Sequence, residues 1–320
     1  MRETDYAYAV ARIRSHENRL LTRADIDRLM AAADENECLR ILADRGYPAA
    51  DTAAQMLAGE LAAAWALLRE LAPELSVFDV LLCRNDYHNV KAAIKGVVAD
   101  ADCAQLFVAE GRVPTATIRK AVEARDFSAL PEPMRAPAAE ALTTLLETGD
   151  GQLADVILDA AQLREMLAAG RASGCAFLER YAELTVAAAD IKMAVRCAKM
   201  DKSGAFMRRA LVDCATLDVP QLIDRALHGG ADAVPDALAN TPYAGAADAL
   251  RTSMAAFETW CDNTVIAALA GAKVKPLGPE PLAAYLLGKE NEIKTVRIIL
   301  SARHNGLPED AVRARIRTLY

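Results

Sequence analysis

The sequence predicts an all-α protein that is built from three related helical units. The 320-residue chain is 53% hydrophobic but only 5% aromatic, and alanine and leucine supply most of its apolar side chains. This composition favours helices, and the chain has few of the β-branched runs that form strands. A regular spacing of lysines indicates an internal repeat, which is the second basis of the prediction.

The repeat is carried by three lysines, Lys91, Lys192 and Lys294, which lie 101 and 102 residues apart. Each lysine follows a polar or acidic residue and then an aliphatic one. A chain breaker precedes each lysine by 18 residues, at Pro73, Gly174 and Pro276. Two nested coincidences at one period predict three repeat units, which comprise residues 1–105, 106–205 and 206–320.

The first unit is expected to open with a helix over residues 5–19, followed by two short helices. Thr22 is a predicted N-cap of the first short helix, and Asp25 occupies the third helical position, where a capping box has its acidic residue. The second short helix covers residues 35–44 and ends where Gly46 can adopt the left-handed conformation of a C-cap. Two long helices complete this unit. The first is capped by Asp51 and reaches residue 70, and the second covers about residues 74–99.

The second unit is expected to repeat this order. Thr115 or Thr117 caps a short helix, and a proline-rich loop follows at residues 130–137. The remaining helices of the unit are predicted at residues 138–147, 153–170 and 175–200.

The third unit starts near residue 203, and Pro220 lies in the first turn of a short helix. A long helix is predicted over about residues 245–270, followed by a loop at residues 273–281 and the helix that carries Lys294. A basic amphipathic helix over residues 309–319 is expected to end the chain.

Charge and composition exclude several classes of protein. A net charge of -7 and an isoelectric point near 5.3 argue against a nucleic-acid-binding protein, which needs a basic surface. The seven cysteines are scattered without a C-x-x-C pair, as expected for reduced thiols in the cytosol. No signal peptide is expected at the start, and the longest apolar run, residues 61–68, is too short to span a bilayer. These features predict a soluble protein.

The sequence predicts no catalytic residue, no cofactor site and no metal site. Lys202-Ser203 resembles the end of a Walker A motif, but the glycines that should precede it are absent. The four histidines have no partner at metal-ligand spacing. There is no G-x-S-x-G motif, and no cysteine has an obvious base beside it in the sequence.

Two interpretations of the three repeated lysines remain open. In one of them, the lysines form ordinary ion pairs on helix surfaces, as Glu290 could do with Lys294 four residues later. In the other, Lys91, Lys192 and Lys294 present three cations to a shared acidic partner. Lys91 and Lys192 have no acidic residue at the spacing that Glu290 has to Lys294, so the ion-pair explanation covers one lysine of the three.

Four segments spread over the chain resemble the central-stalk subunit of the rotary V/A-type ATPases, which is called the C subunit or, in vacuolar complexes, the d subunit. The most specific of them is the run Lys289-Glu-Asn-Glu-Ile-Lys294 with its Val-Arg-Ile-Ile-Leu continuation. The others are residues 8–14, 85–91 and 306–320.

The resemblance implies a funnel-like ring of three helical domains around a pseudo-threefold axis. It also implies a non-catalytic rotor subunit, present in a single copy, that links the central shaft to the membrane rotor ring. Such a subunit would transmit torque for proton or sodium transport and would be cytoplasmic, held peripherally at the membrane by the complex without inserting into it. The alternative is a cytosolic helical-repeat scaffold that binds protein partners, although such scaffolds usually stack shorter repeats.

The last helix is a further candidate for an interface. It carries Arg313, Arg315 and Arg317, and a contact with ring or shaft through exposed helix ends of this kind is expected. The alternative is that these arginines only complement the partial negative charge of the helix C-terminus.

Overall fold

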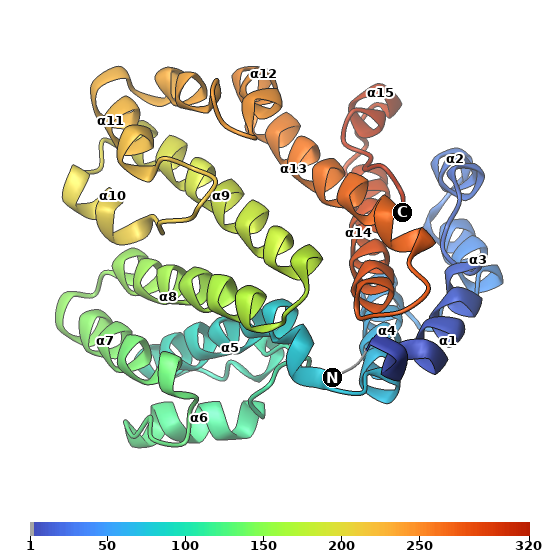
Figure 1. Ribbon diagram of the computed structural model, residues 1–320, viewed down its shortest axis with the longest axis horizontal. Helices are drawn as coiled ribbons and strands as arrows, with labels where there is room; N and C mark the ends of the chain where they lie inside the picture. The colour runs from blue at the N-terminus through green and yellow to red at the C-terminus, as the bar shows by residue number, and fades with distance from the viewer. Residues whose placement is uncertain (1–2) are drawn as a thin grey trace. The chain divides into compact units, whose positions relative to one another are not determined.

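The computed structural model describes residues 3–320, and every regular element in that range is a helix (Figure 1). Within the same range, an isolated bridge between Cys214 and Leu217 is the one β-type pairing. The predicted all-α fold class is therefore confirmed.

The α-helices are α1 (Ala7–Glu17), α2 (Arg23–Ala31), α3 (Glu35–Asp44), α4 (Ala53–Leu71), α5 (Asp79–Ala99), α6 (Thr115–Ala124), α7 (Glu132–Thr148), α8 (Gly151–Ala172), α9 (Ala176–Lys199), α10 (Gly204–Ala210), α11 (Val219–Gly229), α12 (Ala244–Thr252), α13 (Met254–Leu269), α14 (Glu280–His304) and α15 (Glu309–Arg313). Short 3₁₀ helices are η1 (Glu3–Tyr6), η2 (Leu75–Phe78), η3 (Ala104–Leu106), η4 (Ala231–Leu238) and η5 (Ala270–Val274).

Backbone contacts divide the chain into two compact units. The terminal unit combines Met1–Leu75 with Asp248–Tyr320, and the middle unit is Ser76–Ala247. The three repeat units with breaks near residues 105 and 205, and their arrangement as a funnel-like ring, stay predictions.

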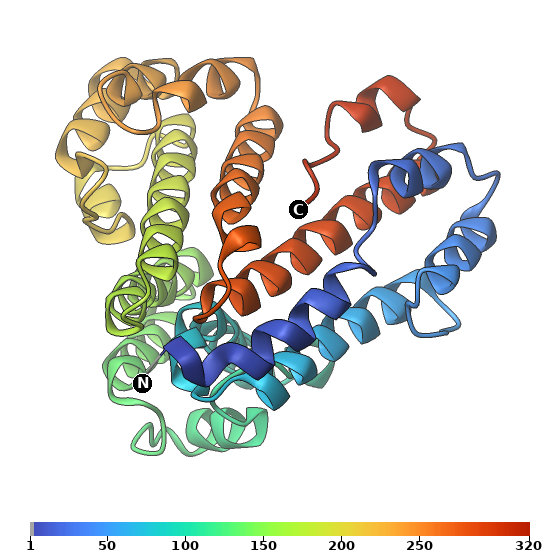
Figure 2. The same ribbon diagram turned by 45° about the vertical axis from the view of Figure 1, so that its right-hand side comes forward.

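The terminal unit is organised around α14. This helix packs against α1, α2, α3, α4, α13 and α15, and Figure 2 shows α1, α4 and α14 lying side by side with roughly aligned axes. Most α14 side chains are buried, including Leu286, Ile293 and Val296. Because α14 is enclosed on several sides, the polar side chains in its sequence are buried as well and must find partners inside the protein.

The middle unit is organised around α8. This helix packs against α5, α7, α9 and α10 (Figure 1). Tyr87 and Val90 of α5 share one apolar cluster with Met134 and Leu142 of α7 and with Leu158 of α8. α8 is thus buried on more than one side, as α14 is in the terminal unit.

Local sequence signals place several helix ends correctly. Thr22 and Asp25 form the predicted capping box of α2, in which each side chain accepts a hydrogen bond from the other residue's backbone N–H. α3 covers the predicted residues 35–44. The predicted cap of α4 is wrong by one residue, because Thr52, and not Asp51, accepts the N–H of Gln55.

The predicted proline-rich loop at residues 130–137 is wrong, because α7 already begins at Glu132. Pro133 is tolerated in the first turn, where no N–H is needed. Pro137 lies inside the helix and cannot donate to the carbonyl of Pro133, four residues earlier. The hydroxyl oxygen of Tyr87 lies 3.3 Å from that carbonyl, while its proton is donated to Glu165 at 2.8 Å.

Two predictions of helix length in the third unit are also wrong. The helix expected over residues 245–270 is divided into α12 and α13, because Ser253 takes an extended conformation and caps α13 through the N–H of Ala256. The helix expected over residues 309–319 ends at Arg313. The following segment is held by side chains of other helices: Asn263 accepts the Thr318 N–H, and Asn291 donates to the Thr318 carbonyl, each at 2.8 Å.

Candidate functional site

The three repeated lysines lie on three long helices. Lys91 is on α5, Lys192 on α9 and Lys294 on α14. Each of the three chain breakers, Pro73, Gly174 and Pro276, lies in the connection that precedes the lysine-bearing helix. Each repeated lysine thus lies on a long helix that is entered through a break, and the repeat units themselves stay a prediction.

Two of these lysines form ion pairs with a neighbouring helix. Lys91 donates to Asp159 of α8 at 2.5 Å, and Lys294 donates to Asp262 of α13 at 2.5 Å. Lys192 and Glu290 are half-buried. The pairs of Lys91 and Lys294 involve half-buried or exposed groups, so their contribution to stability is expected to be small.

A buried charged cluster on α14 was not predicted from the sequence. Lys289 is only 1% exposed and contacts two carboxylates, Glu292 at 2.6 Å and Glu60 of α4 at 2.9 Å. Its ammonium group also lies 5.1 Å from the centre of the Tyr47 ring. Burial opposes the charge of Lys289, but the two carboxylates outweigh it, so that the pKa of the lysine is raised.

Glu292 binds two further groups besides Lys289. One of its oxygens accepts the Tyr47 hydroxyl at 2.5 Å, and the other accepts the backbone N–H of Leu21 at 2.5 Å. Burial and the neighbouring Glu292 raise the pKa of Tyr47, so the phenol stays protonated and remains a donor. The cluster therefore joins α14 to three segments of the first 75 residues.

The only sequence signal for this cluster is that Lys289 and Glu292, three residues apart, stand among residues of an otherwise core-forming helix. Neither Glu60 nor Tyr47 is marked by any local pattern. Their participation depends on the packing of α4 and of the α3–α4 connection against α14.

The middle unit contains a second charged cluster, centred on Arg112. Its guanidinium contacts Asp86 at 2.7 Å and Glu165 at 2.6 Å, and Glu165 also accepts the Tyr87 hydroxyl at 2.8 Å. Burial opposes the charge of Arg112, but hydrogen bonds and attraction from Asp86 and Glu165 outweigh it and raise its pKa. Asp86, which is fully buried, also accepts the backbone N–H groups of Arg112 and Val113.

Arg313 and Arg317 have different surroundings. Arg313 is exposed and contacts Glu309 at 2.7 Å and Asp27 of α2 at 3.2 Å. Arg317 is only 6% exposed and donates to Asp262 at 2.8 Å and to Thr259 at 3.0 Å, both on α13. Arg313 can thus meet a partner directly, whereas Arg317 is engaged inside the terminal unit.

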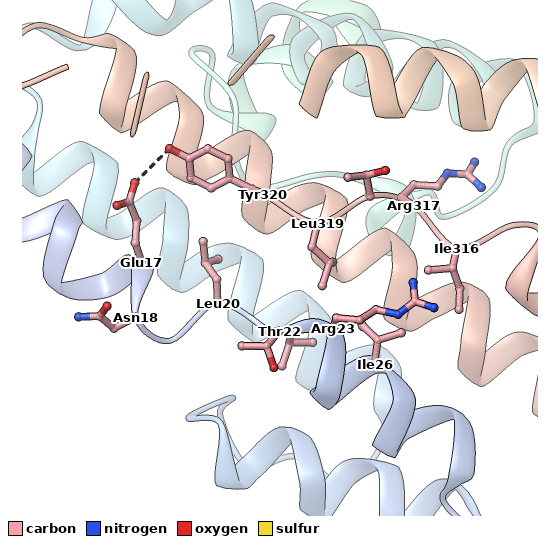
Figure 3. Close-up of a pocket in the computed structure, with 12 residues that line it drawn as sticks. Glu17, Asn18, Leu20, Thr22, Arg23, Ile26, Ile316, Arg317, Leu319 and Tyr320 are labelled. Atoms are coloured by element: carbon pink, nitrogen blue, oxygen red, sulfur yellow. Dashed lines mark hydrogen bonds between the residues drawn. The ribbon is translucent and has the colours of Figure 1, made fainter. Parts of the chain in front are cut away.

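A pocket of about 600 Å³ lies between the last residues of the chain and the connection from α1 to α2. Figure 3 shows Ile316, Leu319 and Tyr320 on one side of it and Leu20 and Ile26 on the other. Its lining is mixed, with apolar side chains beside polar and charged ones such as Glu17, Arg23 and Arg317.

No group of three or more potential metal ligands occurs within residues 3–320. All seven cysteines are free thiols, and burial raises the pKa of Cys83 to about 12, which makes that thiol unreactive at neutral pH. No helix in the same range is long and apolar enough to cross a membrane.

Comparison with known proteins agrees with the resemblance seen in the sequence. Residues 9–315 match the family described as "ATP synthase (C/AC39) subunit". The C subunit of the V-type sodium ATPase of Enterococcus hirae is 21% identical over 257 residues, which cover 79% of this chain and 78% of the relative. The C subunit of the V-type ATP synthase of Thermus thermophilus is 26% identical over 334 aligned positions, which cover 98% of both chains. A second strain of Thermus thermophilus has a relative with the same name and the same values.

The family match extends over all but a few residues at either end of the chain and includes both compact units. It confirms the assignment made from the motif segments, including the expectation of a non-catalytic subunit of a rotary ATPase. The chain belongs to the ATP synthase (C/AC39) subunit family.

Proposed function

We propose that this protein is the central-stalk rotor subunit of a V/A-type rotary ATPase or ATP synthase. In this role it connects the central shaft to the membrane rotor ring and transmits torque between ATP chemistry and the transport of protons or sodium ions. The observation that carries the proposal is the family match over residues 9–315, together with the names of the relatives, each of which is the C subunit of a V-type complex.

The construction of each compact unit suits a part that transmits force. α14 in the terminal unit and α8 in the middle unit are each packed against several other helices, and close-packed helices resist deformation. The buried clusters of Lys289 and Arg112 add charge-assisted hydrogen bonds that have strict geometric requirements. A rotor component needs such stiffness so that rotation at one end is passed to the other end.

The proposal includes the partners and the place of the protein in the cell. A single copy would bind the shaft subunits and the rotor ring on the cytoplasmic side of the membrane. With a net charge of -7, the protein gains little from anionic lipid headgroups, so its attachment to the membrane would depend on other subunits.

The test is a reconstitution of the rotary complex with and without this chain. Without it, the complex is expected to hydrolyse ATP but to transport no ions into sealed vesicles, and adding the purified protein should restore ATP-driven transport. Unchanged transport in its absence would contradict the rotor role. Failure of the protein to bind the complex at all would favour the alternative, a scaffold for other proteins.

A further inference from the structure

The residue two positions before each repeated lysine has the same role in all three helices. These residues are Asn89 on α5, Asp190 on α9 and Glu292 on α14. Although each is polar, their exposures are only 0%, 0% and 2%. A buried polar side chain at a repeated position indicates a repeated structural task, because it is costly to bury unless it is hydrogen-bonded.

Each of these side chains accepts a hydrogen bond from the backbone of a non-helical segment. Asn89 accepts the Val108 N–H at 2.8 Å and donates to the carbonyl of the same residue at 2.8 Å. Asp190 accepts the Val212 N–H at 3.1 Å. Glu292 accepts the Leu21 N–H at 2.5 Å.

The three bound segments occupy related places in the chain. We call them lead-in segments: residues 18–22, 107–114 and 211–218, which lead directly into α2, α6 and α11. Because they are not helical, they cannot satisfy their buried backbone groups internally and need partners elsewhere. Other side chains assist, since Asp86 accepts the N–H of Val113 and Glu183 accepts the N–H of Ala215.

We propose that the position two residues before each repeated lysine is a clasp by which each motif helix holds the lead-in segment of the next repeat. α5 holds the lead-in of the second repeat, and α9 holds that of the third. α14 then holds the lead-in of the first repeat and closes the series. The repeated motif thus serves to join successive repeats to one another, whereas the lysines themselves lie beside the clasps.

The third clasp joins residues that are the farthest apart in the sequence. Asn89 and Asp190 bind segments that follow them by 19 and 22 residues, whereas Glu292 and Leu21 are separated by 271 residues. Bringing distant parts of a chain together costs more conformational entropy than closing a short loop. The contact of Glu292 with the buried Lys289 is a fitting reinforcement at this position.

The test is hydrogen exchange of the three bound amides in the full-length protein. Asp190→Leu removes the acceptor while keeping a similar size, and Asp190→Asn keeps an acceptor and copies the side chain found at residue 89. We expect the Val212 amide to exchange about 10- to 100-fold faster in the Leu variant, which corresponds to the loss of one buried hydrogen bond. It should stay close to the wild-type rate in the Asn variant, while the amides of Leu21 and Val108 are unchanged in both.

The matched pair at the first clasp is Asn89→Leu and Asn89→Asp, with Val108 as the responding amide. For the third clasp, Glu292→Gln retains an acceptor for the Leu21 N–H, and this amide should stay protected. Equal acceleration of all three amides in the Asp190→Leu variant would show general destabilisation and overturn the proposal. If a leucine variant does not fold, amide exchange in the wild-type protein is still a test. Exchange of the Leu21, Val108 and Val212 amides at the rate of unprotected loops would overturn the proposal.

Discussion

Asp190 is a buried carboxyl group whose hydrogen-bond donor is the backbone N–H of Val212 rather than a cation. Burial, together with the nearby Asp213, raises its pKa to about 8, although the Val212 N–H acts in the opposite direction. At neutral pH the group is therefore mostly protonated. Asp213 is itself a carboxylate on the bound segment, so its negative charge disfavours ionisation of Asp190.

This group is predicted to make stability depend on pH. Between its ordinary value near 4 and the raised value of about 8, the native state keeps a proton that the unfolded state releases, so the free energy of unfolding falls as the pH rises. Asp190→Asn removes this titration. Urea unfolding from pH 5 to 8 measures the free energy of unfolding of both proteins. The value for the wild type should fall relative to that of the variant as the pH rises. Parallel plots of this free energy against pH would contradict the assignment.

Lys289 and Lys294 provide a second comparison at the scale of single residues. Lys289→Met leaves Glu292 and Glu60 without their buried cation and is expected to cost about 3–5 kcal/mol. Lys294→Met removes a pair with Asp262 that is open to solvent and should change stability by less than about 1 kcal/mol. Chemical unfolding midpoints measure both.

The Lys289 result has an internal check. Adding Glu292→Gln to Lys289→Met removes one unpaired charge, keeps an acceptor for the Leu21 N–H and leaves an NH2 group that can donate to the Tyr47 hydroxyl oxygen, so part of the lost stability should return. The single variant Glu292→Gln is measured as well. If the double variant loses as much unfolding free energy as the two single variants together, the two side chains act independently and the cluster is not a coupled unit.

At the scale of elements, the segment after α15 acts as a strap across the terminal unit. Residues 314–320 are attached to α13 through Arg317 and Asp262, to α14 through Asn291, and to α1 through a hydrogen bond from Tyr320 to Glu17 at 3.2 Å (Figure 3). The strap passes so close to α14 that only a glycine fits at residue 288. A Cβ atom there would lie 2.8 Å from the Cβ of Tyr320.

Gly288→Ala is therefore expected to displace the strap and to destabilise the terminal unit by about 1–3 kcal/mol, as overpacking generally does. Gly271→Ala is the matched control, because a Cβ at that position meets nothing within 4 Å. Limited proteolysis after residue 313 reports displacement of the strap, and thermal unfolding reports the loss of stability. Equal behaviour of the two variants would show that the contact with Tyr320 is not tight in solution.

At the scale of the whole molecule, the proposed rotor contact can be tested through its exposed arginines. Charge reversal of Arg313 and Arg315 changes two exposed side chains of the terminal unit, and we expect a folded protein whose complex hydrolyses ATP without coupled ion transport. Arg317 is unsuitable for this test, because it is buried against α13 and its reversal would destabilise the strap.

Arg119→Glu with Lys120→Glu on α6 is the control, since both side chains are exposed and the same charge is reversed elsewhere. Circular dichroism establishes folding, and transport into vesicles establishes coupling. Intact coupling in the Arg313 and Arg315 variant would limit these arginines to local roles such as complementing the end of α15, without affecting the family assignment.

The isolated protein is predicted neither to bind nor to hydrolyse ATP. It lacks a phosphate-binding glycine loop, and the described residues 3–320 hold no group of potential metal ligands. Titration calorimetry with ATP and a phosphate-release assay measure this. Turnover that disappears when one residue of this chain is mutated would contradict it.

The sequence alone determined the fold class and the family, and it predicted the repeat. Helix propensity, caps such as Thr22 with Asp25, and the spacing of Lys91, Lys192 and Lys294 are local or periodic signals, and they can be read along the chain. The lengths of individual helices could be predicted less well from the sequence. α7 continues through Pro137 although the carbonyl of Pro133 loses its helical donor, and α15 stops at Arg313 because the strap finds partners on α13 and α14.

Only the tertiary structure decided which polar residues of the motif have buried partners. Glu292 and Leu21 are 271 residues apart, and no pattern near either residue reveals that they meet. The lysine repeat drew attention to Lys294, which lies at the surface, and gave no sign that Lys289, five residues earlier on the same helix, is buried in a charged cluster. A local pattern shows that a residue can form an ion pair, but whether the pair is enclosed depends on which helices pack around it.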